Sequence, residues 1–357
     1  ACRGASGGSA AAGDTLWVGV AVGLKNPERY VNVFEGVQIA LDELNAKRPP
    51  GASVLAMRRP IANAKTPVEI AVAFRDDPRV IGVVGHTESG ATIEAGGIYS
   101  DRANQGKNAL AAVSPTAGSL GVTRSSEWIF RVCPTTDQQS QALARYLADT
   151  LGVKSAAMLY TNDAAGSDLL KAFIAEFSKH GGVVTERDPL TDDVVELDAY
   201  PKRIVSRRTP SAVIAANTNA ERPFVRALRA AGGRQIVLGT NPPEVGDSSA
   251  QRDLTGARFV QLFSASHPAT PVGARFTTTF RQKTGRVADR WGALAYDAAM
   301  LIGHAAQSEG GDRRRIRDWI AAVGRGKPAF TGATGTIQFD EHRDPVNKHL
   351  RIAEANQ

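Results

Sequence analysis

Three groups of residues have the types or spacing that catalysis or metal binding would require. The string from Gly4 to Gly8 reads G-x-S-x-G, the pattern around the nucleophile of many hydrolases. It has no strand before it and no helix after it, so we predict that it forms no nucleophile elbow. Among the histidines only His342 and His349 lie near each other in sequence, which is weak support for a metal site. Cys133 is more typical of a small buried apolar residue than of a nucleophile.

Other signatures of chemistry are missing from the sequence. It contains no G-x-x-x-x-G-K-[ST] loop, no G-x-G-x-x-G after the first predicted strand, no H-E-x-x-H and no C-x-x-C. No pair of carboxylates can be placed together in a cleft, so general acid–base chemistry is unsupported rather than excluded. We therefore predict a protein without metal or cofactor that is not an enzyme.

Length and composition describe a globular chain. Its 357 residues suggest about two domains, and 42% hydrophobic with 22% charged residues is an ordinary balance. The net charge is +7, but the basic runs are short, scattered and without aromatic interleaving, so no nucleic-acid partner is predicted. The longest apolar stretch, 16–24, is much shorter than the roughly 20 residues of a membrane span.

The amino-terminal segment has the composition of a flexible tether. Residues 3–13 are almost entirely Gly, Ser and Ala, and Cys2 precedes them. Such a start resembles a mature bacterial lipoprotein, in which a signal peptide is cut before the cysteine that then carries the lipid. We predict a tether over 1–14 with Cys2 as lipid anchor and the only membrane attachment. The alternative is a cysteine without a role in a disordered tail.

The rest of the chain alternates between strands and helices. The segment 30–46, for example, places Phe34, Val37, Leu41 and Leu44 on one helical face. Predicted strands are 16–22, 53–57, 80–85, 109–113, 155–160, 183–184, 212–216 and 235–238. Predicted helices are 30–46, 67–74, 92–102, 138–151, 167–180, 200–207 and 222–231. This order predicts an α/β protein with two doubly wound, Rossmann-like lobes.

Several segments then resemble a known family, the type I periplasmic binding proteins, in the branched-chain amino acid-binding branch that serves ABC transporters. They are 16–45, the stretch from Val80-Ile-Gly-Val-Val-Gly-His to Ser114-Pro115, Phe130-Arg131 with Asp137-Gln138, and Gly332-Ala-Thr-Gly-Thr-Ile-Gln-Phe-Asp340. The resemblance covers residue 15 to the end and depends on the order and spacing of these segments.

The resemblance implies two lobes joined by three hinge crossings, near 132–135, 264–267 and 331–335. Lobe 1 is then 15–133 plus 266–332, and lobe 2 is 134–265 plus 333–357. A small ligand would bind in the cleft at the carboxyl ends of the strands, and an ABC permease would recognise the closed form. The implied protein is a monomeric receptor in the periplasm or at the cell surface. The alternative is a sensor or envelope-assembly lipoprotein of the same fold that binds a protein partner.

The resemblance also implies ligand contacts, one position at a time. Ser89 matches the serine that holds a ligand carboxylate, at the start of a helix whose free N–H groups favour an anion. Its alternative role is an ordinary helix cap. Glu88 lies beside it, at the cleft mouth or in the pocket, and Trp291 matches an aromatic wall, with core packing as its alternative role. The remaining candidate positions are Thr116, Gly118, Ser119, Asp163, Ala165, Thr218 and Asn241.

Departures from the family pattern affect the expected ligand. Glycine stands at position 118 where the family has a carboxylate-binding threonine, and Ala165 and Thr218 replace tyrosines. Asn241 replaces the acid that holds an ammonium group, and a buried cation without a countercharge is costly. An ordinary α-amino acid would then bind poorly unless Glu88, Asp163 or Glu244 substitutes. The predicted ligand is an amino acid, an amide or a small organic acid.

Overall fold

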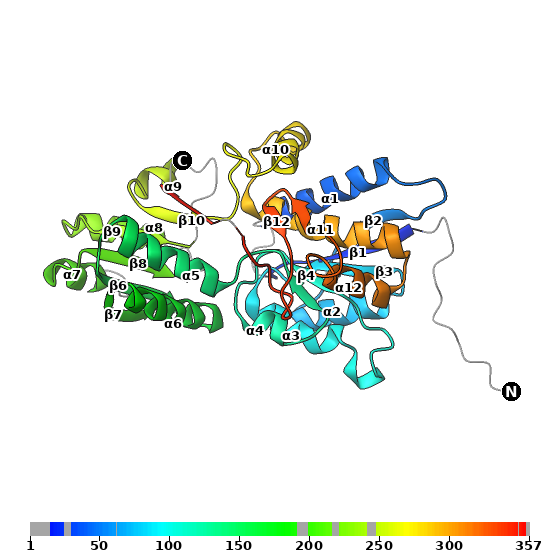
Figure 1. The fold of residues 1–357 in the computed structure, drawn as a ribbon, viewed down its shortest axis with the longest axis horizontal. Coiled ribbons are helices and arrows are strands. Elements are labelled where there is room, and N and C mark those ends of the chain that lie inside the picture. The colour runs from blue at the N-terminus through cyan, green and yellow to red at the C-terminus, as the bar shows by residue number, and fades with distance from the viewer. Residues whose placement is uncertain are drawn as a thin grey trace. The chain divides into compact units, whose positions relative to one another are not determined.

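The computed structural model describes residues 15–24, 30–61, 63–190, 199–215, 221–240, 248–348 and 350–354 (Figure 1). The chain divides into two compact units. Unit 1 comprises 1–117, 121–133 and 268–348, and unit 2 comprises 118–120, 134–267 and 349–357. Each is an α/β unit built on its own sheet. The predicted tether and Cys2 lie outside the described residues.

Unit 1 is built on a parallel sheet of five strands in the order β2-β1-β3-β4-β5. Its central strand β3 is buried along its whole length, as a strand covered on both faces must be. The strands are β1 (Thr15–Ala21), β2 (Val54–Arg58), β3 (Val80–Gly85), β4 (Ala112–Ser114) and β5 (Ile129–Arg131).

Helices cover both faces of this sheet (Figure 1). Residues of α2, α3 and α4 contribute Ile70, Tyr99 and Val122 to one buried cluster, whereas α11 packs Ile302 against Gly82 of β3 on the other face. The helices of unit 1 are α1 (Val31–Ala46), α2 (Pro67–Asp76), α3 (Ser89–Tyr99), the one-turn α4 (Gly121–Arg124), α10 (Pro271–Thr284), α11 (Arg290–Glu309) and α12 (Arg313–Ala321), with a 3₁₀ turn η2 (Arg102–Asn104).

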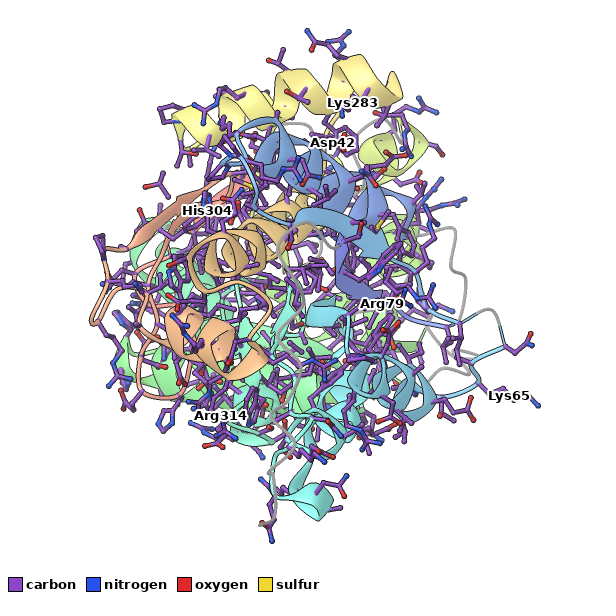
Figure 2. All side chains as sticks on the ribbon, turned by 90° about the vertical axis from the view of Figure 1, so that its right-hand side faces the viewer. Asp42, Lys65, Arg79, Lys283, His304 and Arg314 are labelled. Atoms are coloured by element: carbon purple, nitrogen blue, oxygen red, sulfur yellow. The ribbon has the colours of Figure 1, made fainter. Side chains whose placement is uncertain are left out.

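Helices α1 and α11 cross at two glycines. A Cβ added to Gly36 would lie 2.1 Å from the backbone oxygen of Gly292, so only glycine allows this approach. Two polar links accompany the crossing. Asn32 Nδ2 donates to Asp289 Oδ2 over 2.7 Å, and Tyr296 Oη donates to Glu43 Oε2 over 2.6 Å. On the outer surface, Lys283 of α10 pairs with Asp42 of α1 (Figure 2).

A half-buried arginine joins α12 to the sheet. The guanidinium of Arg313 donates to four backbone oxygens, those of Arg75, Asp77, Val80 and Asn108, over 2.5 to 2.9 Å. Burial lowers its pKa to about 10, which leaves it charged at neutral pH. The first residue of α12 thereby joins the end of α2, the start of β3 and the segment before β4.

The predicted third crossing at 331–335 is wrong. These residues form an antiparallel hairpin of β11 (Phe330–Gly332) and β12 (Gly335–Ile337), which belongs to unit 1 with everything up to residue 348. The buried carboxylate of Asp297 in α11 holds this turn. It accepts hydrogen bonds from Ala333 N over 2.5 Å, Thr334 N over 2.9 Å and Thr334 Oγ1 over 2.6 Å. The division falls instead at 348/349, while the boundaries nearest the other two predicted crossings lie at 133/134 and 267/268.

Unit 2 has a six-stranded sheet in the order β13-β10-β9-β8-β6-β7, parallel except for β13. One buried cluster includes Phe173 and Phe177 of α6, and another includes Ile204, Phe224 and Leu228 of α7 and α8. The strands are β6 (Ser155–Thr161), β7 (Val183–Leu190), β8 (Ser211–Ala215), β9 (Ile236–Gly239), β10 (Arg258–Gln261) and β13 (Arg351–Glu354). The helices are α5 (Thr136–Arg145), which continues as a π turn over Tyr146–Thr150, α6 (Ala164–Lys179), α7 (Ala199–Ser206), α8 (Glu221–Ala230) and α9 (Ser248–Asp253).

The predicted alternation is confirmed, with shifts at the element ends. The helix predicted over 92–102 begins at Ser89 and ends at Tyr99, because Asp101 has a left-handed backbone with φ 48°. The strand predicted over 183–184 runs to Leu190. Cys133 is buried as predicted, and burial raises its thiol pKa to about 11. Within the described ranges, no helix is long and apolar enough to cross a membrane, and no three potential metal ligands cluster.

Candidate ligand-binding site

The loop after β3 in unit 1 carries two of the candidate residues and is fixed by hydroxyl groups. Ser114 Oγ donates to His86 O over 2.6 Å, and Thr116 Oγ1 donates to Thr87 O over 2.6 Å. The Gly23 amide, just after β1, donates to Thr87 Oγ1 over 3.1 Å. The carboxyl ends of β1, β3 and β4 are thus linked side by side. Thr116 therefore supports this loop through its hydroxyl.

His86 in the same loop is a core residue. Its side chain is 1% exposed, and Nε2 lies 3.0 Å from Tyr99 Oη. Burial lowers its pKa to about 4, so the imidazole is uncharged at neutral pH. It supports the loop and offers no charge to a ligand.

Glu88 is exposed and accepts a hydrogen bond from Tyr30 Oη at 2.8 Å. Both groups lie against the backbone of Gly23, where an added Cβ would come 2.5 Å from Tyr30 Oη and 2.6 Å from Glu88 Oε1. Glycine at this position therefore allows the pair to form. The sequence analysis did not select Tyr30. Its position could have marked it, because it is an aromatic residue directly before the helix that follows the buried strand β1.

Trp291 lies in the first turn of α11, half-buried, with its ring edge-on to Tyr30 at 5.8 Å and 87°. Arg290 places its guanidinium 5.3 Å from the centre of the Trp291 ring. The crossing of α1 and α11 brings Tyr30 and Trp291 together, because each lies at the start of its helix. The result is an aromatic wall beside the Glu88 carboxylate.

Ser89 is the first residue of α3 and is half-buried. The Glu88 side chain occupies the preceding position but makes no capping hydrogen bond. Space around the first turn is open, since a Cβ added to Gly90 would meet no atom within 4 Å. Such a helix start favours a negatively charged group through its N–H groups and dipole. Unit 1 therefore presents Ser89, Glu88, Tyr30 and Trp291 on one sheet edge and its adjoining helix starts.

In unit 2, the segment 118–120 packs on the starts of α5 and α6. Gly118 O accepts from the Thr136 amide over 2.9 Å, and a Cβ on Gly118 would lie 3.1 Å from Thr136 Cγ2. Ser119 is 1% exposed, and its hydroxyl donates to Asp168 Oδ2 over 2.6 Å. The same oxygen accepts from the Leu120 amide over 3.3 Å. The Ser119 hydroxyl is therefore occupied inside unit 2.

Asp163 and Ala165 follow β6. Asp163 is exposed and caps α6, with Oδ1 accepting from the Gly166 amide over 2.7 Å and from Thr161 Oγ1 over 3.1 Å. Ala165 is 4% exposed and offers no polar group. Thr218, Asn241 and the alternative acid Glu244 lie outside the described residues.

Two further hydroxyls of unit 2 were missed from the sequence. Thr136 is 4% exposed at the start of α5, and Thr240 is 5% exposed just after β9. Their Oγ1 atoms are buried, and among the described residues neither has a hydrogen-bond partner. Buried hydroxyls without partners are uncommon in proteins, so each has capacity for a polar group.

Comparison with known proteins identifies the family to which this fold belongs. Residues 6–357 match the model of a protein family that is described as "Periplasmic binding protein". This chain belongs to that family. The resemblance drawn from the sequence segments, and the α/β fold with parallel-sheet lobes, are thereby confirmed.

Relatives of this periplasmic binding protein carry amino acid-binding names. An "Amino acid binding protein" of Pseudomonas aeruginosa is 24% identical over 68% of this chain, a match that spans 59% of that protein's own length. The "Leu/Ile/Val-binding protein homolog 3" of Brucella melitensis is 27% identical over 73% of this chain and 69% of its own.

Solved structures share the fold with different ligands. A substrate-binding protein of an ABC transporter from Desulfitobacterium hafniense in complex with Leu is 22% identical, with a TM-score of 0.80 over 96% of this chain and 97% of its own. A solute-binding protein from R. palustris in complex with benzoate is 16% identical, with a TM-score of 0.80 over 96% and 93%. At these identities the likeness concerns the fold alone.

Proposed function

We propose that this periplasmic binding protein is the solute-binding receptor of an ABC uptake system and catalyses no reaction. The observation that carries the proposal is the group at the carboxyl edge of the unit 1 sheet. There Ser89 starts α3, and Glu88, Tyr30 and Trp291 stand beside it. Ligands of open α/β sheets bind at this edge. A helix start with a hydroxyl and an aromatic wall suits binding of a small molecule better than bond cleavage.

The ligand class that we propose is a small polar molecule: an amino acid, an amide or an organic acid, of which the two acids carry a carboxylate. Ser89 and the first turn of α3 would receive the carboxylate, and Tyr30 with Trp291 would contact the rest of the molecule. Thr116 and Gly118 would keep the loops in place, with Ser119 anchoring 118–120 to Asp168. Relatives and neighbours named for Leu/Ile/Val, Leu and benzoate support a carboxylate as the common feature.

Whether an ammonium group is also bound depends on a countercharge. Asn241 provides none, so we propose Glu88 or Asp163 for an amino acid ligand, with Ala165 and Thr218 leaving room where the family has tyrosines. Affinity for leucine, isoleucine or valine in the micromolar range would contradict the hypothesis that ordinary amino acids bind poorly. It would leave the receptor function intact.

A ligand screen tests the proposal. Protein freed of co-purified ligand by unfolding and refolding is screened by thermal shift against amino acids, amides, aliphatic acids and aromatic acids. A ligand at 100 times its Kd should stabilise the protein by about 2.7 kcal/mol.

Calorimetry then compares Ser89→Ala with Ser308→Ala, a control at an exposed serine of α11. Loss of a hydrogen bond to a charged group, ~1.5–3 kcal/mol, should weaken binding about tenfold to a hundredfold. Equal affinities in the two variants, or no shift with any compound, would contradict the proposal.

We also propose that Cys2 anchors the protein to a bacterial membrane through a lipid, in the periplasm or at the cell surface. The support is a cysteine followed by a segment of Gly, Ser and Ala. Cells that express the full-length gene and its Cys2→Ser variant are labelled with an alkyne fatty acid and fractionated. Label and membrane association that depend on Cys2 are expected. Equal distribution of the two proteins would contradict the anchor.

A further inference from the structure

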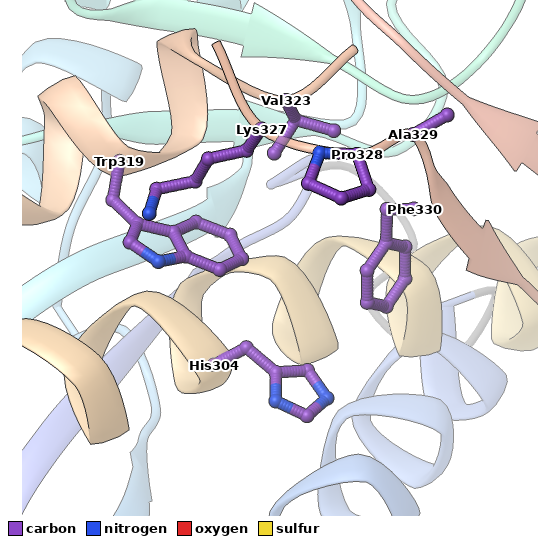
Figure 3. Close-up of a pocket in the computed structure, with 7 residues that line it drawn as sticks. All are labelled: His304, Trp319, Val323, Lys327, Pro328, Ala329 and Phe330. Atoms are coloured by element: carbon purple, nitrogen blue, oxygen red, sulfur yellow. The ribbon is translucent and has the colours of Figure 1, made fainter.

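A pocket lies in unit 1, built by other residues than the group around Ser89. It has a volume of about 370 Å³ and is formed by α11, the end of α12 and the turn that leads into β11 (Figure 3). This volume is within the range of small-molecule sites, roughly 300–1,000 Å³. Its lining residues are His304, Trp319, Val323, Lys327, Pro328, Ala329 and Phe330.

The walls of the pocket are apolar and largely aromatic. Trp319 and Phe330 are half-buried, Val323 is buried, and Pro328 is exposed at the surface. The Phe330 ring lies 5.8 Å from the His304 ring at an angle of 60°. Aromatic and proline surfaces of this kind suit a flat apolar group.

The turn that carries Lys327 is held by backbone hydrogen bonds. Ala322 O accepts from the amides of Gly326 over 2.9 Å and Lys327 over 2.8 Å, and Lys327 O accepts from Gly324 N over 2.9 Å. Gly324 has φ 79°, and a Cβ there would lie 2.1 Å from Gln338 Cβ, so the turn packs tightly on its neighbour. The pocket rim is therefore formed in advance of any ligand.

A single cation stands at this rim among the lining residues. Lys327 Nζ lies 5.4 Å from the centre of the Trp319 ring (Figure 3), and within the described part of the chain it forms no hydrogen bond or ion pair. Glu309 interacts with it electrostatically but already pairs with Arg315 over 2.6 Å. Burial lowers the pKa of His304, which keeps that ring uncharged at neutral pH. The pocket thus combines a positive charge without a close partner and aromatic walls.

We propose that this pocket is a second ligand site, specific for a small aromatic carboxylate. The ring would lie between the Trp319, Pro328 and Phe330 surfaces, and the carboxylate would pair with the Lys327 ammonium. The Lys327 charge attracts an acid, does not attract a neutral analogue and repels a cationic one, so it selects the acid over both. This proposal is independent of the function of the Ser89 group.

The test is a fluorine NMR titration of the protein with 4-fluorophenylacetate and with 2-(4-fluorophenyl)ethylamine, which has the same ring and the opposite charge. Lys327→Met is compared with Lys65→Met, a matched change at an exposed lysine of unit 1. We expect saturable binding of the acid, weakened about tenfold by Lys327→Met because a charge-assisted contact is lost, and unchanged by Lys65→Met. Lys327→Glu should reverse the preference, so that the amine binds more tightly than the acid.

Thermal midpoints of the variants should match the parent protein, because the Lys327 ammonium forms no hydrogen bond within the described residues. Trp291→Leu separates the two sites, since it changes only the Ser89 group: binding of the acid that depends on Lys327 should remain in this variant, and any part that the variant removes belongs to the Ser89 group. The proposal is overturned if the acid does not bind, if Lys327→Met binds it as well as the parent, or if Trp291→Leu abolishes the signal.

Discussion

Replacement of Gly36 by alanine is expected to destabilise unit 1, although alanine is the better helix former. Within α1 the substitution gains about 1 kcal/mol of helix propensity. Its Cβ, however, would lie 2.1 Å from Gly292 O, a backbone atom that cannot rotate away. Overpacking of this kind costs about 1–3 kcal/mol, and a contact this short belongs at the upper end. The net loss is then about 2 kcal/mol.

Gly97→Ala is the matched control. Gly97 is exposed in α3, and an added Cβ would meet nothing within 4 Å, so only the gain of about 1 kcal/mol remains. The same chemical change should therefore act in opposite directions at two helical glycines, with a difference of about 3 kcal/mol between the variants.

Urea unfolding followed by circular dichroism measures both variants. Each kcal/mol also corresponds to about 2–4 °C in thermal midpoint for a domain of roughly 150–250 residues. Because the crossing brings Tyr30 and Trp291 together, Gly36→Ala should weaken ligand binding too, and Gly97→Ala should not. If Gly36→Ala is as stable as Gly97→Ala, the helices do not need glycine where they cross, and the reasoning is refuted.

Three further predictions concern polar groups that are buried or half-buried. Arg313→Met should destabilise unit 1 by about 3 kcal/mol or more in urea, because four backbone oxygens lose a charged donor; an unchanged midpoint would contradict this. Burial lowers the pKa of His86 from 6.5 to about 4, so its imidazole contributes fully to the free energy of unfolding above pH 6.5. As the pH falls toward 4, the unfolded state binds a proton that the folded state does not, and up to ~3 kcal/mol of stability is lost. The His86→Gln variant should lack that part of the pH dependence, which parallel denaturation curves would detect. In a Cys2→Ser background, Cys133 should react with a thiol reagent only after unfolding, because burial raises its pKa to about 11; fast labelling of the native protein would contradict its burial.

The arrangement of elements was predictable because it depends on local patterns. A few consecutive residues are enough to recognise the continuous apolar run of β3. The same is true of the helical face of α1, which carries Phe34, Val37, Leu41 and Leu44. The assignment of 333–348 was not predictable in this way. It depends on Asp297, whose hydrogen-bond partners lie 36 and 37 residues away along the chain.

The candidate site was predictable only where a family pattern marked it. Ser89 and Glu88 were found through the loop after β3, but the Tyr30–Glu88 hydrogen bond joins residues 58 apart and needs the close approach of Gly23. Ser119 was selected by position, yet its hydroxyl partner Asp168 lies 49 residues on. The Thr136 and Thr240 hydroxyls, which have no hydrogen-bond partner among the described residues, leave no trace in spacing or composition, since such a lack is a property of the packed state alone.

The packing of α1 on α11 has a consequence for biosynthesis. Asn32 and Asp289, which join the starts of the two helices, are 257 residues apart, and all of 134–267 belongs to unit 2. Because the chain is made from the amino terminus, unit 2 can therefore collapse around strands β6 to β10, before its last strand β13, while α1 still lacks its neighbour. Helix α1 lacks its partner until residues 290–309 of α11 have been made, and such delayed long-range pairing slows folding and favours aggregation. The sheet of unit 1 is therefore made in full by residue 131, long before the helix that packs on α1.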